Sequence, residues 1–175
     1  LVVGRETPPG GIANREYGIA AYEVLDEETP AWGEIGDEEL ERLRIRAGTP
    51  RFGHELDDRV LPAEAGLDRT AIDFEKGCYP GQEIVARSQY LGKLKRRMFL
   101  AHVDAEAAPG DHLYSADMNG QASGTVVNAA PSPRGGFDLL AVAQVESANT
   151  QTLHLKADDG AALALDAGER IGLIG

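Results

Sequence analysis

The sequence contains very few of the residues that build disulfide frameworks and thiolate metal sites. It has one cysteine, one tryptophan and two methionines in 175 residues, and aromatic residues make up 6% of it. A single cysteine excludes a disulfide within the chain and a cluster held by thiolates of this chain alone. It also fits a reducing compartment, so we expect a cytoplasmic protein.

Long apolar runs and a positive overall charge are absent as well. No apolar stretch approaches the roughly 18 residues that cross a bilayer, so we expect no membrane partner. The formal net charge is −12, from 17 basic and 29 acidic residues, which argues against general nucleic-acid binding by the whole surface. The hydrophobic content of 42% is ordinary for a globular protein, and the length allows one or two domains.

The charges that are present are unevenly distributed. Residues 23 to 41 hold nine acidic residues and no basic one, whereas residues 84 to 103 hold five basic residues and no acidic one. Such runs usually form solvated faces. A cationic strip in an acidic protein would also suit an anionic ligand, and both interpretations stay open.

The most informative segment runs from Lys76 to Arg87 and contains Cys78. It reads Lys-Gly-Cys-Tyr-Pro-Gly-Gln-Glu-Ile-Val-Ala-Arg. The glycines and the proline predict a tight turn, and Pro80 suits the first turn of a helix. The apolar spacing from residue 84 to 91 predicts that helix, and Gly92 is a plausible stop.

Cys78 would therefore lie just before a helix N-terminus. Unpaired N–H groups and the positive end of the helix dipole stabilise a thiolate there, and Lys76 adds to the effect. An arbitrary lone cysteine is more often a small buried apolar residue, but the residues that flank this one are turn formers and polar groups. On the chemistry of the segment alone, a reactive thiol and a buried apolar cysteine are about equally supported.

Two segments resemble a known family. The Lys-Gly-Cys-Tyr-Pro-Gly-Gln-Glu run followed by Val-Ala-Arg resembles the signature of YgfZ-type proteins. These are a branch of the folate-binding superfamily that includes the glycine-cleavage T-protein, an aminomethyltransferase. The run from Leu43 to Gly53 resembles the superfamily's leucine-arginine, alanine-glycine, proline and aromatic-glycine pattern. With the linking residues 61 to 68, the resemblance covers residues 40 to 97.

The resemblance implies an α+β fold and the C-terminal portion of a longer protein. Residues 1–92 would be the C-terminal part of the folate-binding, T-protein-like α/β region, and residues 93–175 a small antiparallel β-barrel. The pattern of residues agrees, because about six short strands separated by turns suggest a closed or nearly closed barrel. The candidate strands are Lys95–Val103, His112–Ser115, Ala122–Val127, Phe137–Val145, Thr152–Lys156 and Ala161–Leu165.

Fewer elements are expected before residue 92. Asp37 is a good N-cap, and apolar residues at helical spacing up to Ala47 predict a helix that Gly48 ends. We also expect strands over residues 17–25 and 71–74. The arginines of the helix, including Arg44, are expected on its exposed side.

The resemblance implies a folate-binding accessory protein that supports iron–sulfur cluster assembly or repair and, through it, tRNA modification. Its cofactor would be tetrahydrofolate, and its partners iron–sulfur proteins or their assembly factors, without direct contact to nucleic acid. Cys78 would be the functional thiol, as a nucleophile or a transient sulfur or iron ligand. The supporting motif residues are Lys76, Gly77, Tyr79, Gly81, Gln82 and Glu83, and the candidate anion- or folate-binding residues are Arg87 and Arg44. We expect no metal held by this chain alone, since the four histidines are scattered singly.

A genuine aminomethyltransferase is the alternative function. In that family the essential aspartate lies in the N-terminal half, outside this chain, and the position of Cys78 does not usually carry cysteine. The resemblance therefore favours an accessory role over catalysis. Two positions depart from the family pattern: Leu40 replaces an aromatic residue that stacks on the pterin, and Arg46 replaces glutamate. A purely structural interaction domain is a third possibility.

Overall fold

The computed structural model describes residues 2–3, 8–24, 35–56, 62–67, 71–73, 76–83 and 94–166. Near the N-terminus, three short strands form an antiparallel sheet in the order β1-β3-β2. They are β1 (Val2–Val3), β2 (Ile12–Asn14) and β3 (Ala21–Glu23). The strand predicted over residues 17–25 is thus shorter in the structure, and its last residue lies outside the described part.

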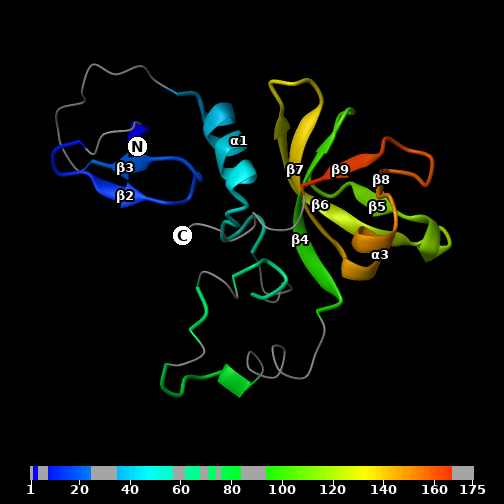
Figure 1. Cartoon of the computed structure of the whole chain (residues 1–175), viewed down its shortest axis with the longest axis horizontal. Helices are drawn as coiled ribbons and strands as arrows, with labels where there is room; N and C mark the ends of the chain where they lie inside the picture. The colour runs from blue at the N-terminus through cyan, green and yellow to red at the C-terminus, as the bar shows by residue number, and fades with distance from the viewer. Residues whose placement is uncertain are drawn as a thin grey trace.

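Helix α1 (Asp37–Ala47) lies between this sheet and a second, larger sheet (Figure 1). Gly48 ends it in the left-handed conformation at φ 69°, as the sequence predicts. The N-cap is Gly36 rather than Asp37, because the backbone of Gly36 is extended and its carbonyl accepts a hydrogen bond from Leu40 N–H. Asp37 instead joins the acidic first turn, where carboxylates suit the helix dipole.

The second sheet has six antiparallel strands in the order β8-β5-β6-β7-β4-β9. An isolated antiparallel bridge between His154 and Ala162 brings its two edges together. Hydrogen bonds from Leu155 N–H to the Ala161 carbonyl and from Leu163 N–H to the Leu153 carbonyl support this closure. The predicted α+β class with a small, nearly closed antiparallel barrel is therefore confirmed. The strands are β4 (Arg96–Val103), β5 (His112–Tyr114), β6 (Ala122–Pro131), β7 (Phe137–Gln144), β8 (His154–Leu155) and β9 (Leu163–Leu165).

Some local expectations for these segments are wrong. Residues 71–73 form a turn and irregular backbone, not a strand. Strand β6 runs four residues beyond the predicted end at residue 127. Two short helices between strands were not predicted: η1 (Ala116–Met118) and α3 (Val145–Thr150). The domain boundary expected near Gly92 lies outside the described residues and stays a prediction.

Barrel strands β4 and β7 bury both of their faces, because one face fills the barrel and the other lies under α1. Alternate residues such as Ala101, Leu139 and Ala141 belong to the interior cluster. The intervening residues Leu100 and Leu140 pack with fully buried Ile45 of α1. This second cluster fixes the helix against the outside of the barrel. Among the described residues, no helix has the length and apolar character needed to span a membrane.

Candidate functional site

Cys78 lies on the surface of the protein as a free, exposed thiol. Its neighbours Lys76, Gly77 and Pro80 are exposed too, and only Tyr79 is partly covered. Of the two interpretations left open by the sequence, the structure thus shows the exposed cysteine and not the buried one. In Figure 1 this segment lies at the lower end of the molecule, apart from α1 and the barrel.

The backbone after Cys78 forms a tight turn for reasons that can be read from its residues. The Gln82 N–H donates a hydrogen bond of 3.2 Å to the carbonyl of Tyr79, so residues 79–82 make one turn. Pro80 occupies its second position, and Gly81 has φ 87° at its third, as a type II turn requires. A Cβ on Gly81 would meet no atom within 4 Å, so conformation and not space demands glycine there.

The side chains beside Cys78 are held by local contacts. The Lys76 Nζ lies 4.7 Å from the centre of the Tyr79 ring, in cation–π contact. The Lys76 backbone N–H donates to the Asp73 carboxylate at 3.2 Å. Lys76 and Tyr79 therefore contact each other across Cys78 in the sequence, and the thiol stays exposed.

Part of the predicted site lies outside the described residues. Gln82 and Glu83 have helical backbone, which is where the predicted helix begins, but residues 84–93 are not described. Arg87 is among them, so its role in anion binding stays a prediction. Within the described part of the chain, no group of three or more His, Cys, Asp or Glu side chains could hold a metal ion.

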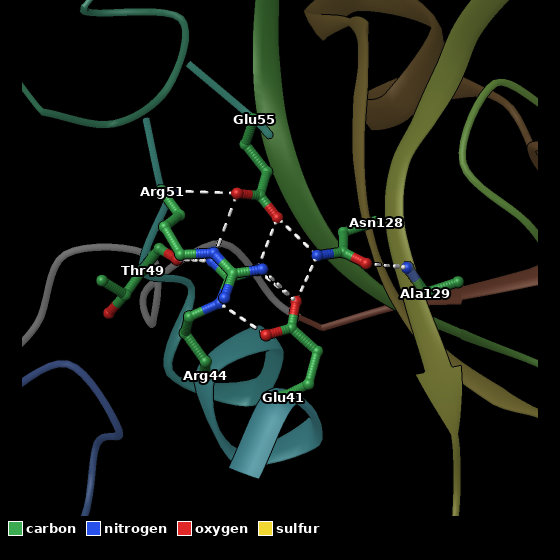
Figure 2. A network of polar contacts seen from close by, with 7 residues as sticks. All are labelled: Glu41, Arg44, Thr49, Arg51, Glu55, Asn128 and Ala129. Atoms are coloured by element: carbon green, nitrogen blue, oxygen red, sulfur yellow. Dashed lines mark hydrogen bonds and ion pairs between the residues drawn. The ribbon is translucent and has the colours of Figure 1, made fainter. Parts of the chain in front are cut away.

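Arg44 lies inside the protein, only 2% exposed, and not on the exposed side of α1 as the sequence analysis expected. Figure 2 shows its guanidinium between two carboxylates that come from different segments. It donates to Glu41 at 3.0 and 2.6 Å, to Glu55 at 3.2 and 2.6 Å, and to the carbonyl of Thr49. These contacts use all five N–H groups of the side chain, so none remains for a ligand. In this structure Arg44 joins segments of the protein to one another and does not present a donor to an anionic ligand.

The same network connects α1 to the barrel. Asn128 of β6 donates to both carboxylates, at 2.6 Å to Glu55 (Figure 2). A β-bulge between Val126 and Asn128 presents this side chain to the helix. Arg51 completes the network through its backbone N–H, 2.9 Å from Glu55, and its guanidinium, 3.3 Å from Glu41. The buried charges are thus paired, as burial requires.

These contacts set the ionisation of the network. Hydrogen bonding from Arg44 lowers the pKa of Glu41 below its ordinary value. Burial acts to raise the pKa of Glu55, but hydrogen bonds from Arg44, Asn128 and Arg51 outweigh it and lower this pKa as well. Burial likewise acts to lower the pKa of Arg44, and both carboxylates overcome it and raise that pKa. All three groups are therefore charged at neutral pH.

His102 and Asp138 form a second polar pair that the sequence analysis missed. They face each other directly in the register of β4 and β7, and His102 Nδ1 lies 2.9 Å from a carboxylate oxygen of Asp138. Asp138 is only 3% exposed. The signal was present in the sequence, since His102 and Asp138 each interrupt a run of apolar residues. The two were not connected because strand pairing is not local.

No protein-family model matches the chain. Among curated proteins, a tRNA-modifying protein YgfZ from Sodalis glossinidius is 33% identical over 127 residues, which cover 70% of this chain and 39% of the relative. A protein of the same name from Aliivibrio fischeri is 38% identical over 89 residues, covering 49% of the chain and 28% of the relative. An aminomethyltransferase from Streptomyces avermitilis is 34% identical over 109 residues, which cover 61% of this chain and 29% of the relative.

The chain spans well under half the length of these relatives, between 28 and 39% of it. The matches nevertheless include both kinds of protein that the resemblance of residues 43–53 and 76–87 predicts, namely YgfZ-type proteins and an aminomethyltransferase. The barrel and the helix packed against it agree with the fold expected from that resemblance. The chain belongs to the YgfZ-type proteins of the superfamily that includes the glycine-cleavage T-protein, an aminomethyltransferase.

Proposed function

We propose that the chain is part of a folate-binding accessory protein that supports iron–sulfur cluster assembly or repair and, through it, tRNA modification. The observation that carries the proposal is the exposed, free thiol of Cys78, directly before a conformationally restricted turn. The relatives named tRNA-modifying protein YgfZ support the link to tRNA modification. The role of tetrahydrofolate and that of iron–sulfur proteins are our inference from the family resemblance.

In this proposal Cys78 acts in contact with a partner. One thiolate is too few for an iron–sulfur cluster, which takes about four such ligands. Cys78 would therefore act as a nucleophile or as a transient ligand that a partner protein completes. An exposed thiol suits either role, because the partner must reach the sulfur directly.

Complementation tests the role of the thiol. Cells that lack their own YgfZ-type protein would receive the wild type, Cys78→Ala or Asp158→Asn, the last an exposed change in a barrel loop. We expect the wild type and Asp158→Asn to restore both the activity of an iron–sulfur enzyme and the level of a dependent tRNA modification. Cys78→Ala should fold normally, because the side chain is exposed, but restore neither. Full restoration by Cys78→Ala would refute the assigned role.

Folate binding is tested separately on the purified full-length protein of which this chain is a part. We expect titration with tetrahydrofolate to give saturable binding that Cys78→Ala does not change, because the thiol is not assigned to the folate. If no binding is measured while Cys78→Ala still fails to complement, the folate part of the proposal is wrong and the thiol part stands.

The similarity to an aminomethyltransferase favours one alternative, the transfer of a one-carbon unit to tetrahydrofolate. An assay of the purified full-length protein with an aminomethylated lipoyl carrier and tetrahydrofolate distinguishes the two functions. The accessory function predicts no turnover above the rate without protein. Appreciable turnover would establish the enzymatic function instead.

A further inference from the structure

A pocket of about 230 Å³ lies between α1 and the outside of the barrel. Its polar walls come from Arg46 of α1, His102 of β4, Arg134 and Asp138 around the start of β7, and Asp166 after β9. Within the described part of the chain, none of its lining residues belongs to the Cys78 segment. The pocket is smaller than the roughly 300 Å³ at which sites for drug-sized ligands begin, so its size suits a small molecule.

Asp138 forms the anchor of the pocket. Its carboxylate lies 2.9 Å from His102 Nδ1, 3.5 Å from Arg46 and 3.4 Å from Arg134. Burial acts to raise the pKa of Asp138, but the hydrogen bond from His102 and the charge of Arg46 outweigh it and lower this pKa. Asp138 is therefore an anion already surrounded by donors, and it holds two guanidinium groups at the pocket wall.

Arg46 and Arg134 differ from Arg44 in how many of their donors are used. All five N–H groups of Arg44 have partners. In the described part of the chain, the side chains of Arg46 and Arg134 each make one contact, a long one to Asp138. They are 44% and 65% exposed, so their remaining donors face the pocket and solvent. Two arginines with unused donors beside one pocket form a site for an acceptor-rich anion.

The acidic groups nearby do not cancel this preference. The Asp104 side chain, 3.2 Å from His102 Nε2, is 91% exposed, and Asp166 is exposed as well. Exposed carboxylates are screened by water and interact weakly with neighbouring charges. The buried carboxylate of Asp138 takes one long contact from each guanidinium group, so the other N–H donors of Arg46 and Arg134 remain available to a ligand.

We propose that this pocket binds a small anion that carries a carboxylate or a phosphate group, through the guanidinium groups of Arg46 and Arg134. The two groups share the chemistry that matters, because each presents oxygens that accept paired hydrogen bonds from arginine. The site goes beyond the proposed function and does not depend on Cys78.

NMR titration of the ¹⁵N-labelled protein tests the site. Inorganic phosphate and succinate serve as separate probes, with sodium chloride at matched ionic strength as the blank. We expect saturable shifts of the backbone amides of His102, Ala164 and Leu165 with at least one probe, and the probe that binds more tightly identifies the ligand class. Shifts with both probes that grow linearly, as they do with chloride, would overturn the proposal.

Variants assign the binding to the two arginines. The double change Arg46→Gln and Arg134→Gln should weaken binding by about tenfold or more, because it removes both charged donors. Arg42→Gln removes the same charge from the same helix outside the pocket, and binding should stay within about twofold. Ala164→Phe, which fills the pocket and keeps its charges, should also abolish binding. Unchanged affinity in the double variant or in Ala164→Phe, or equal weakening in Arg42→Gln, would contradict the site.

Discussion

Arg44 and Arg46 are two residues apart on α1, and this spacing places their side chains on opposite sides of the helix. Successive helical residues are rotated by about 100°, so these two side chains point roughly 200° apart, with Ile45 between them. Arg44 enters the buried network, Ile45 enters the apolar cluster, and Arg46 reaches the pocket wall. The sequence shows only alternating arginines. Their different roles come from partners that the sequence places far away.

Removal of one carboxylate from the buried network should destabilise the protein strongly. Glu55→Gln leaves the Arg44 guanidinium buried with one anionic partner, Glu41, in place of two. We expect a loss of roughly 2 to 4 kcal/mol in the free energy of unfolding, because a buried charge loses its compensation. Urea unfolding followed by circular dichroism measures this loss.

Glu39→Gln is the matched control on the same helix. Glu39 pairs with Arg42 at 3.1 Å, but its side chain is 57% exposed, and such surface pairs contribute about 1 kcal/mol or less. The two variants should therefore differ clearly in their urea midpoints. Equal losses would mean that burial of the Arg44 network adds no stability.

At the scale of secondary structure, the elements with strong local signals were predictable. Glycine at the end of α1, and the apolar runs of β4 and β7 bounded by turn residues, predicted those elements within one residue of the structure. The helix α3 was missed because its sequence, Val-Glu-Ser-Ala-Asn-Thr, is short and rich in poor helix formers. The true length of β6 was missed because the bulge after Val126 interrupts its alternation.

The close packing of the turn between β6 and β7 against β4 can be tested by adding one methyl group at Gly136. Gly136 has φ 61°, and a Cβ there would lie 2.1 Å from the carbonyl oxygen of Val103. Since that contact is with the backbone of β4, it cannot be relieved by a side-chain rotation. We expect Gly136→Ala to reduce the free energy of unfolding by about 3 kcal/mol or more, measured by urea unfolding.

Gly135 provides the comparison within the same turn. Its φ is 89°, but a Cβ at this position would meet no atom within 4 Å. Gly135→Ala should therefore cost only the strain of a left-handed residue, about 1 to 2 kcal/mol. A loss at Gly135 as large as that at Gly136 would contradict the close approach of the turn to β4.

At the scale of the whole molecule, stability depends on contacts that join distant parts of the chain. Glu55 and Asn128 are 73 residues apart, and His102 and Asp138 are 36 apart. Periodicity and turn residues predict elements, but they do not predict which buried polar residues will meet. The sequence therefore indicated the barrel and the cysteine turn, while the network and the pocket required the structure.

These distant contacts predict a specific loss of stability in acid. The pKa values of Glu41, Glu55 and Asp138 are all lowered in the folded protein. Their contribution is complete above the unfolded values, about 4 for carboxyl groups, and is lost as the pH falls through the lower folded values. Urea midpoints measured from neutral pH down to about pH 3 should fall steeply below about pH 4.

Glu55→Gln separates this linkage from general acid unfolding. The variant lacks one of the titrating carboxylates, so its urea midpoint should start lower at neutral pH and fall less over the acid range. Parallel curves for the variant and the wild type would show that Glu55 does not contribute through its ionisation.

The most direct test of the central claim is the reactivity of Cys78 toward iodoacetamide at neutral pH, in folded protein and in protein unfolded by urea. With one cysteine in the chain, the rate of alkylation reports on this residue alone. We expect the folded protein to react at least as fast as the unfolded protein, because the thiol is exposed directly before the turn of residues 79–82. A folded protein that reacts more than about tenfold slower would show a protected thiol and contradict the proposed role of Cys78.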